Sequence, residues 1–396
     1  MHDAIRRAAD ELRGEIAGIS RDLHDHPELS LEETRSSALL RERLAAAGFQ
    51  VSAGAGSLPT AFVARTGSGG APRVALLAEY DALPGIGHGC GHNLIAAAST
   101  GAGLVLARAA ASTGPGKLPG TLLVIGTPAE ETVGGKALMV RDGVFKEVDA
   151  ALMVHGAAEW RVFTDSLACV SLEVTYRWRE SHAVAWPEKG INALDALIQL
   201  FVALDMMKKR LGRDVRIPGV ILEGGQRANI IPAKAVGAFS LRAPTSAGRD
   251  QVRAEFERTA RAVADGTGCG IEIRQMDQSY DAMLTNTTLA RRFKTHLSAM
   301  GIETVDTPRQ NKGSLDMGNV SRALPSIHPL IAAAGPEAPL HSARFAAATL
   351  LPQAEEALMS AVKALALTAY DALSEPALLR EAREEFERQT RAETPA

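Results

Sequence analysis

The chain has 396 residues, which is longer than one hydrophobic core usually supports, so its length predicts two domains. With 46% hydrophobic residues, 22% charged residues and a net charge of −3, the composition is that of a globular protein, and it gives no reason to expect nucleic acid or an anionic membrane as a partner. Three cysteines, at positions 90, 169 and 269, do not suit a disulfide framework, so we expect a cytoplasmic protein.

The N-terminal sequence MHDAIRRAADELRGEI predicts a polar-faced helix and contains no apolar signal core. The longest apolar stretch, LIAAASTGAGLVLA, stops at Arg108 and is too short to span a bilayer, so we expect no membrane partner. Between these two stretches, SLEETRSSALLRERLAAAG predicts a helix. Ser30 and Glu33 have the spacing of a capping box at its start, and Gly48 marks its end.

Short apolar strands then alternate with helices. This pattern predicts an α/β fold with a mixed, mostly parallel sheet and helices on both faces. In such sheets ligands bind beyond the carboxyl ends of the strands, and polar clusters follow all three predicted strands. The predicted strands are 73–79, 121–127 and 150–155, and the predicted helices are 94–111 and 134–142.

The order of the predicted elements changes at about residue 168, where a strand, a helix, two strands, a helix and a strand follow one another. This order suits a small inserted α+β domain of the ferredoxin-like kind. The chain then returns to the first domain with a long helical stretch that Pro352 breaks or kinks. We therefore predict a first domain made of residues 1–167 and 279–396, which carries the polar clusters, and an inserted domain, 168–278.

The first polar cluster is GIGHGCGHN, in which Cys90 and His92 are one glycine apart. It could be a turn, since glycine-rich loops often follow strands. It could hold a nucleophilic thiol with His88 or His92 as its base, although no known cysteine-hydrolase signature is present. It could also supply a thiolate and an imidazole to zinc or another first-row metal ion.

The segment GTPAEE favours the metal site. Glu130 and Glu131 could be ordinary solvated carboxylates, the commoner fate of paired glutamates. Two adjacent carboxylates can also divide the work of hydrolysis, because one binds a metal ion while the other accepts a proton from the water that this ion activates. His155 follows the third strand and adds another ligand for the same edge of the sheet.

Seven segments, in the same order, resemble the M20 metallopeptidase family. The resemblance covers almost the whole chain and is strongest to the amidohydrolase branch that contains the aminobenzoyl-glutamate hydrolase subunit and the aminoacylase-1-like 2 proteins. The segments are LHDHPELSLEE (23–33), AEYDALPGIGHGCGHN (78–93), GTPAEETVGGK (126–136), SHAVAWPEKGINALDA (181–196), ANIIP (228–232), GSLDMGNVSRALPSIHP (313–329) and PLHSARF (339–345).

The resemblance implies a site with two divalent metal ions, Zn²⁺ or Mn²⁺. It also implies a homodimer formed through the inserted domain, which serves as a lid, and in dimeric relatives the partner subunit supplies a histidine that stabilises the oxyanion. The implied metal ligands are Cys90, His92, Glu131, His155 and His341. The implied catalytic residues are Glu130 as the general base, Asp81 as a support of the metal site, and His182 as the oxyanion donor. Asn229, Asp316 and His328 are implied near the substrate, with a satisfied core histidine as the alternative for His328, while His24 and His26 are expected to be structural.

The sequence departs from the family pattern beside the candidate site. Relatives usually have alanine at Gly89 and proline at Gly156, a small hydroxyl residue at Leu315, and a glycine and a small residue where this chain has 178–180, WRE. The implied ligands are present, so we predict a metal-dependent amidohydrolase acting on an N-acyl or aminobenzoyl amino acid or a small dipeptide. The alternatives are hydrolytic deamination of an aryl amine or amidine, and a non-catalytic metal-binding homologue.

Overall fold

The computed structural model describes residues 1–113, 118–212, 214–307 and 312–393. The chain forms two compact units. Unit 1 consists of Met1–Asp165, Met283–Asn311 and Asp316–Ala396, and unit 2 of Ser166–Ala282 and Lys312–Leu315. The predicted inserted segment, 168–278, lies within unit 2, which also takes a short later segment that the sequence pattern did not assign to it.

A six-stranded sheet forms the centre of unit 1. Its strand order is β1-β2-β4-β3-β5-β13. The first two pairings, of β1 with β2 and of β2 with β4, are antiparallel, and the other three are parallel. The sheet is therefore mixed and mostly parallel, as predicted. The strands are β1 (Gln50–Ala55), β2 (Leu58–Gly67), β3 (Arg73–Ala78), β4 (Thr121–Gly126), β5 (Ala150–Leu152) and β13 (Ser326–Ile327).

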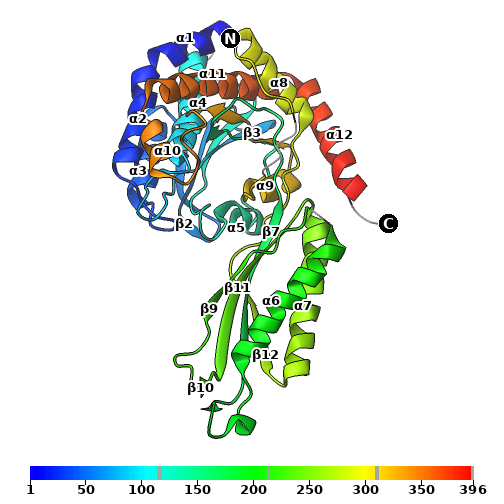
Figure 1. The fold of residues 1–396 in the computed structure, drawn as a ribbon. Coiled ribbons are helices and arrows are strands. Elements are labelled where there is room, and N and C mark those ends of the chain that lie inside the picture. The colour runs from blue at the N-terminus through cyan, green and yellow to red at the C-terminus, as the bar shows by residue number, and fades with distance from the viewer. Residues whose placement is uncertain (114–117, 213, 308–311, 394–396) are drawn as a thin grey trace. The chain divides into compact units, whose positions relative to one another are not determined.

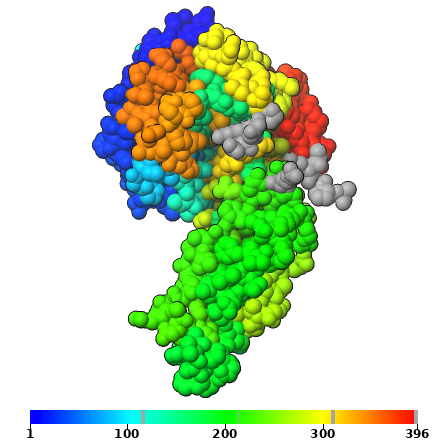
Figure 2. All heavy atoms as spheres, in the orientation of Figure 1, coloured from blue at the N-terminus to red at the C-terminus, as the bar shows by residue number. Residues whose placement is uncertain are grey.

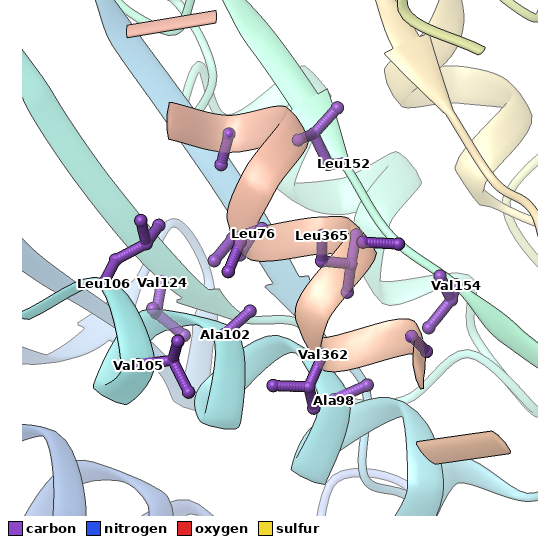
Figure 3. Packing of buried hydrophobic residues seen from close by; sticks show 14 of the residues in the cluster. Leu76, Ala98, Ala102, Val105, Leu106, Val124, Leu152, Val154, Val362 and Leu365 are labelled. Atoms are coloured by element: carbon purple, nitrogen blue, oxygen red, sulfur yellow. The ribbon is translucent and has the colours of Figure 1, made fainter. Parts of the chain in front are cut away.

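Helices pack on this sheet and build the main core. Leu76, Val124 and Leu152 from three neighbouring strands meet apolar side chains of α4 and α11 (Figure 3). In Figure 2 the surface of α10 and α11 (orange) adjoins that of the N-terminal helices (blue), and α11 contacts both α1 and α2. The helices of unit 1 are α1 (His2–Glu11), α2 (Arg13–Asp25), α3 (Thr34–Ala46), α4 (His92–Ser112), α5 (Gly135–Arg141), α8 (Thr287–Ala299), α9 (Met317–Ala323), α10 (Ala343–Ala348), α11 (Pro352–Ser374) and α12 (Pro376–Glu393).

Helix α4 has 21 residues and is longer than the apolar stretch that predicted it. By length and composition it could cross a membrane, but 83% of its apolar window is buried inside the protein. One such helix is weak evidence of a membrane span, because the core helix of a soluble protein passes the same test. Its apolar surface is used in packing against α11, α1 and α2.

Two local predictions were wrong and one was confirmed. The predicted capping box does not form. The α3 N-cap makes no side-chain capping bond, and Ser30 and Glu33 bond to residues of the sheet end instead. The predicted strand 150–155 is interrupted after Leu152, and a second strand, β6 (His155–Ala157), pairs in parallel with β14 (Leu330–Ala332). The predicted break at Pro352 is confirmed, because this residue begins α11.

Unit 2 is built on a four-stranded antiparallel sheet with the strand order β12-β7-β11-β9. Helices α6 and α7 cover one face of this sheet (Figure 1). Their inner side chains and those of β7 and β11 form a separate core. The elements are β7 (Ala168–Arg177), β8 (Ser181–His182), α6 (Ala193–Leu211), β9 (Gly219–Glu223), β10 (Ile230–Ile231), β11 (Lys234–Ala243), α7 (Ser246–Thr267) and β12 (Gly270–Gln275).

Candidate metal centre

The residues predicted as metal ligands converge at one end of the sheet in unit 1. They come from the start of α4, from the loop after β4, from the first residue of β6 and from the turn before α10. Three overlapping groups have their ligand atoms within 4.8 Å of one another, a spacing at which each could hold a metal ion. The groups are Cys90, His92 and His155; Cys90, Glu131 and His341; and Glu79, His92 and Glu130.

Local backbone geometry brings these ligands together. Gly91 has φ of +82°, in the left-handed region that favours glycine, and begins α4 as its N-cap. This turn lets both Cys90 and His92 face the same site. His341 also has a positive φ, of +61°, and its backbone N–H donates to the carbonyl oxygen of Gly89 at 2.8 Å. The turn before α10 is thereby tied to the Cys-Gly-His loop.

Cys90 lies at the centre of two of the groups. Its Sγ is 3.5 Å from His155 Nε2 and 3.3 Å from His341 Nε2. His155 Nδ1 is 2.7 Å from the carbonyl oxygen of Gly156, a bond that requires a proton on Nδ1, so a neutral His155 ring presents an unprotonated Nε2 to the site. Burial raises the pKa of the Cys90 thiol to about 12, although the neighbouring His92 lowers it. A metal ion binding here would therefore displace the thiol proton.

His92 is fixed by carboxylates on both sides. Its Nδ1 is 3.1 Å from Asp81 Oδ1, and its Nε2 is 3.0 Å from Glu79 Oε1 and 3.7 Å from Glu131 Oε1. Burial lowers the pKa of His92, but Glu79, Cys90 and Asp81 raise it further, so the net shift is upward. A carboxylate behind a histidine that faces a site is the usual support of a metal-binding imidazole. Asp81 therefore has the geometry of the support that was predicted.

The electrostatics of the cluster fit a cation. Glu131 Oε1 is buried and has no hydrogen-bond partner among the described residues, and the buried His92 Nε2 faces the oxygens of Glu79 and Glu131 without a well-aligned hydrogen bond to either. Buried polar atoms without partners are rare and call for a ligand or an ion. Burial, together with the charges of Glu79 and Asp316, raises the pKa of Glu130 well above its ordinary value. Thiolate, imidazole and carboxylate ligands in one cluster suit a divalent first-row metal ion.

A buried ion-pair network lies behind the cluster, and the sequence analysis missed two of its members. The Lys136 Nζ pairs with Glu79 and lies 2.9 Å from Asp316 Oδ1, while the Lys136 backbone N–H donates to Asp316 Oδ2 at 2.8 Å. Asp316, which was predicted to lie near the substrate, is fully buried in this structure and bonds to Lys136. It has no exposed surface. A carboxylate at the end of an apolar strand, two residues before Asp81, was the available signal for Glu79.

The remaining histidines of unit 1 have different positions. The His328 ring is buried, and its centroid is 5.5 Å from that of His155, so the residue adjoins the cluster. His88, considered as a base for the thiol, is buried with Nε2 3.1 Å from the carbonyl oxygen of Leu23, and burial lowers its pKa to about 3. His24 and His26 bond to α2 residues: His24 Nδ1 to the Asp25 carboxylate, and His26 Nδ1 to the Asp22 carbonyl.

His182 lies in unit 2 on β8, and Asn229 directly precedes β10, the short strand that pairs with β8. The Ala183 N–H donates to the carbonyl oxygen of Asn229, and both predicted site residues are exposed. The His182 Nδ1 accepts hydrogen bonds from two backbone N–H groups, of Val184 at 3.3 Å and of Ala185 at 3.1 Å. A neutral ring that accepts at Nδ1 carries its proton on Nε2, so His182 presents an exposed N–H donor.

A cavity of about 580 Å³ in unit 1 lies away from the candidate metal centre. It is lined by strands β1, β2 and β4 and by the loop after α5, with Arg65, Arg73 and Glu147 among its charged residues. None of the candidate metal ligands lines it. The candidate site is therefore recognised by its convergent ligand atoms and not by cavity volume.

Comparison with known proteins gives one consistent result. The model of peptidase family M20/M25/M40 matches residues 75–370. The chain is 35% identical over 397 residues to the Xaa-Arg dipeptidase of Mus musculus, covering 96% of this chain and 91% of that protein. It is 32% identical over 322 residues to a subunit of the p-aminobenzoyl-glutamate hydrolase of Escherichia coli, covering 76% of this chain and 65% of that protein.

Solved structures share the fold at lower identity. A putative aminohydrolase from methicillin-resistant Staphylococcus aureus superposes with a TM-score of 0.78 at 22% identity, covering 94% of this chain and 100% of that one. A dinuclear metal-binding peptidase of the M20 family from Bacillus subtilis superposes with a TM-score of 0.71 at 22% identity, covering 92% of this chain and 99% of that one. With the family match spanning most of the sequence, the chain belongs to peptidase family M20/M25/M40.

Proposed function

We propose that the protein is a metal-dependent amidohydrolase that cleaves the amide bond of an N-acyl or aminobenzoyl amino acid or of a small dipeptide. The observation that carries this proposal is the pair of ligand groups that share Cys90, with Glu130 in a third group beside them. The names of the relatives, an Xaa-Arg dipeptidase and an aminobenzoyl-glutamate hydrolase subunit, support the substrate class.

Five residues would hold two divalent ions, with Zn²⁺ or Mn²⁺ the candidates: Cys90, His92, Glu131, His155 and His341. Such ions, when bound, lower the pKa of a water molecule and polarise the amide carbonyl. Glu130 would accept the proton of the attacking water and return it to the leaving nitrogen. Asp81 would hold the His92 ring in its binding orientation, since its Oδ1 faces Nδ1.

We further propose that unit 2 is a ferredoxin-like lid and dimerisation domain. Its exposed His182 N–H is suited to stabilise the oxyanion of the tetrahedral intermediate, and Asn229 and His328 would contact the substrate. Two apolar features support a second copy as the partner. One is the exposed stripe of Ile198, Val202 and Met206 on α6. The other is the exposed edge strand β9, with Val220, Ile221 and Leu222. A bare apolar edge strand favours pairing with another chain.

The first experiment measures metal content and product together. Purified protein is assayed against acyl amino acids, dipeptides, aminobenzoyl-glutamate and aryl amines, before and after treatment with a strong chelator. We expect release of a free amino acid, its loss on chelation, and its recovery with Mn²⁺ or Zn²⁺. Full activity of metal-free protein would refute the proposal, and release of ammonia alone would support deamination instead.

A second experiment tests the role of His182. Loss of one oxyanion donor typically lowers turnover about 10²–10³-fold, so His182→Ala should be nearly inactive and fully metallated. The matched control is His24→Ala, a histidine of α2 outside the ligand groups, which should keep full activity. If the donor acts across a dimer, exchanged heterodimers of His182→Ala with Glu130→Ala should recover activity. Verified heterodimers without recovery would exclude the trans arrangement.

A further inference from the structure

Glu33 is a buried carboxylate that the proposed mechanism does not use. Its side chain has no exposed surface. One oxygen, Oε1, accepts the backbone N–H of Ala129 at 2.9 Å, and the other, Oε2, accepts the hydroxyl of Thr60 at 2.9 Å. No lysine or arginine pairs with Glu33 in the described part of the chain. A buried carboxyl group bonded only to neutral donors is costly, and burial raises the pKa of Glu33, so a position of this kind calls for an explanation.

Ala129, the partner of Oε1, immediately precedes Glu130 and has an unusual backbone. Its φ is +62°, in the left-handed region where residues with a Cβ are strained by roughly 1–3 kcal/mol. Both of its backbone polar groups are held, since its N–H donates to Glu33 and its carbonyl oxygen accepts the N–H of Gly135 at 3.0 Å. This turn sets the direction in which the two glutamates leave strand β4.

The segment that carries Glu33 also contacts the chain on the other side of Glu130. Ser30 donates to Asp81 Oδ2 at 2.7 Å, and the same oxygen accepts the backbone N–H of Glu131 at 3.0 Å. Glu33 therefore holds the N–H of the residue before Glu130, while Ser30 supports the carboxylate that holds the N–H of the residue after it. Leu31, between them, has a positive φ of +71°. It is one of only three non-glycine residues with positive φ in the described chain, the others being Ala129 and His341.

We propose that Glu33 is a positioning residue of the candidate site: its carboxylate holds Ala129 in the left-handed conformation that directs Glu130 and Glu131 into the metal centre. The inference deepens the proposed function and rests on it for the roles of the two glutamates. The proposed role requires Oε1 to accept a hydrogen bond from one specific group, the Ala129 N–H. It can therefore be distinguished by experiment from a general contribution of Glu33 to folding.

A nearby glutamate provides the matched control. Glu28 lies five residues earlier in the same segment and accepts the backbone N–H groups of Ser36 at 2.7 Å and Arg35 at 3.0 Å. These groups belong to the first turn of α3, so Glu28 stabilises a helix end and has no bond to the loop of Glu130. Glu28→Ala should lower stability and leave turnover unchanged.

The experiment compares Glu33→Ala, Glu33→Gln and Glu28→Ala with the wild type, at saturating metal, on the substrate that the wild type hydrolyses. Displacing reacting groups by about 1 Å can cost about 10²-fold, so we expect Glu33→Ala to lower kcat about 10- to 100-fold with KM little changed. Glu33→Gln keeps an acceptor oxygen and should retain most activity. Equal kcat for Glu33→Ala and Glu28→Ala, after correction for the folded fraction, would overturn the proposal.

A double variant tests the backbone route itself. Glycine adopts positive φ without strain, so Ala129→Gly alone should change kcat little, and in the Glu33→Ala protein it should recover part of the lost activity. No recovery would contradict the proposed route through Ala129. Should Glu33→Ala fail to fold, Glu33→Asp replaces it, because aspartate keeps the charge but is too short to reach the Ala129 N–H. A kcat of Glu33→Asp equal to that of the wild type would then overturn the proposal.

A spectroscopic measurement separates this inference from the proposed function. Titration with Co²⁺, whose visible absorption reports ligand geometry, does not require a substrate. We expect Glu33→Ala to alter the Co²⁺ spectrum or weaken Co²⁺ binding through the displaced Glu131, and Glu28→Ala to match the wild type. An unchanged spectrum and affinity in Glu33→Ala refutes the positioning role. A wild type that binds Co²⁺ but hydrolyses nothing refutes the proposed function alone.

Discussion

Unit 1 contains two clusters in which histidines share buried carboxylates, and they differ in how the charges are balanced. In the first, Asp371 on α11 accepts bonds from His2 Nε2 at 2.6 Å, from His296 Nε2 at 2.8 Å and from Arg292 Nη1 at 2.9 Å. Both of its oxygens are used, and Arg292 makes two further bonds to Glu375. Every carboxylate oxygen of Asp371 has a hydrogen-bond donor, and we call a cluster with matched donors and acceptors closed.

The candidate metal centre is built from the same residue types but is not closed. Four carboxylates surround His92, from Glu79, Asp81, Glu130 and Glu131, and the buried lysine beside them, Lys136, pairs with Glu79. Glu131 Oε1 has no hydrogen-bond partner among the described residues, and His92 Nε2 faces the Glu79 and Glu131 carboxylates without a well-aligned hydrogen bond to either. The comparison teaches that residue type does not separate a structural cluster from a functional one, whereas unmatched charge and unpartnered atoms do.

The largest expected effect comes from the glutamate pair. Glu130→Gln keeps the shape of the side chain but removes the base, so we expect catalysis to fall about 10²–10⁴-fold with the metal content unchanged. Glu131→Gln should weaken metal binding by about 10-fold or more, because it disturbs the coordination shell. Metal analysis and steady-state kinetics of the two variants check this division. Equal metal content and equal residual activity in both would show that the assigned roles are wrong.

The next prediction concerns the buried lysine of the open cluster. Lys136→Met keeps the length of the side chain but leaves Glu79 and Asp316 buried without their cation. Breaking a buried pair in this way typically costs about 3–5 kcal/mol of unfolding free energy. Urea unfolding of metal-free protein measures this cost. Added Zn²⁺ or Mn²⁺ should reduce it, because a bound cation offsets the charge of Glu79, and an equal cost with and without metal would contradict the open-cluster interpretation.

The two clusters also show what the sequence could predict. The parallel strands were predictable because apolar runs bounded by turns alternate with helices, and their ends carried the polar residues that converge in the structure. The break after Leu152 could not be predicted, because it depends on the pairing of β6 with β14, which joins residues about 175 positions apart in the sequence. Ser30 and Glu33 have capping-box spacing, but their tertiary partners, Asp81 and Ala129, took precedence over the local bond.

The candidate ligands were predictable from motifs, whereas the network behind them was not. Cys90 and His92 lie in one short loop whose spacing allowed a turn, a reactive thiol or a metal site, and the later segment GTPAEE favoured the metal site. Lys136 reads as an ordinary helix residue, and only its contacts with Glu79 and Asp316, 57 and 180 positions away in the sequence, make it part of the site. Likewise, nothing local indicates that His2 and His296 share Asp371. Buried charge networks depend on long-range pairing, which the pattern along one strand or helix does not encode.

The closed cluster yields a stability prediction with no catalytic effect. Asp371→Asn removes the charge that pairs with Arg292 and the two histidines, so we expect the unfolding free energy at neutral pH to fall by about 2 kcal/mol. The turnover of the folded variant should equal that of the wild type, because none of its partners belongs to the candidate ligand groups. Denaturant unfolding and kinetics on the same sample check both halves. A large loss of turnover would mean that the two clusters are coupled.

The smallest effect is the pH dependence of that difference. Burial raises the pKa of Asp371, but the bonds from His296, Arg292 and His2 outweigh it and lower the pKa to about 2, below the ordinary value of 3.8. A carboxyl whose folded-state pKa is lowered contributes stability that is full above its unfolded-state pKa and is lost as the pH falls toward the folded one. The groups facing it are His2 from α1 and Arg292 and His296 from α8, with Glu375 bound to the same arginine. The stability difference between the wild type and Asp371→Asn should therefore be present in full at about pH 5 and shrink between about pH 4 and pH 2. Urea titrations of both proteins at matched pH values measure this stability difference, and the effects of the other carboxylates cancel because both proteins contain them. A difference that stays constant from about pH 5 down to about pH 2 would show that Asp371 is not held by these charges. The closed cluster would then differ from the metal centre in geometry alone.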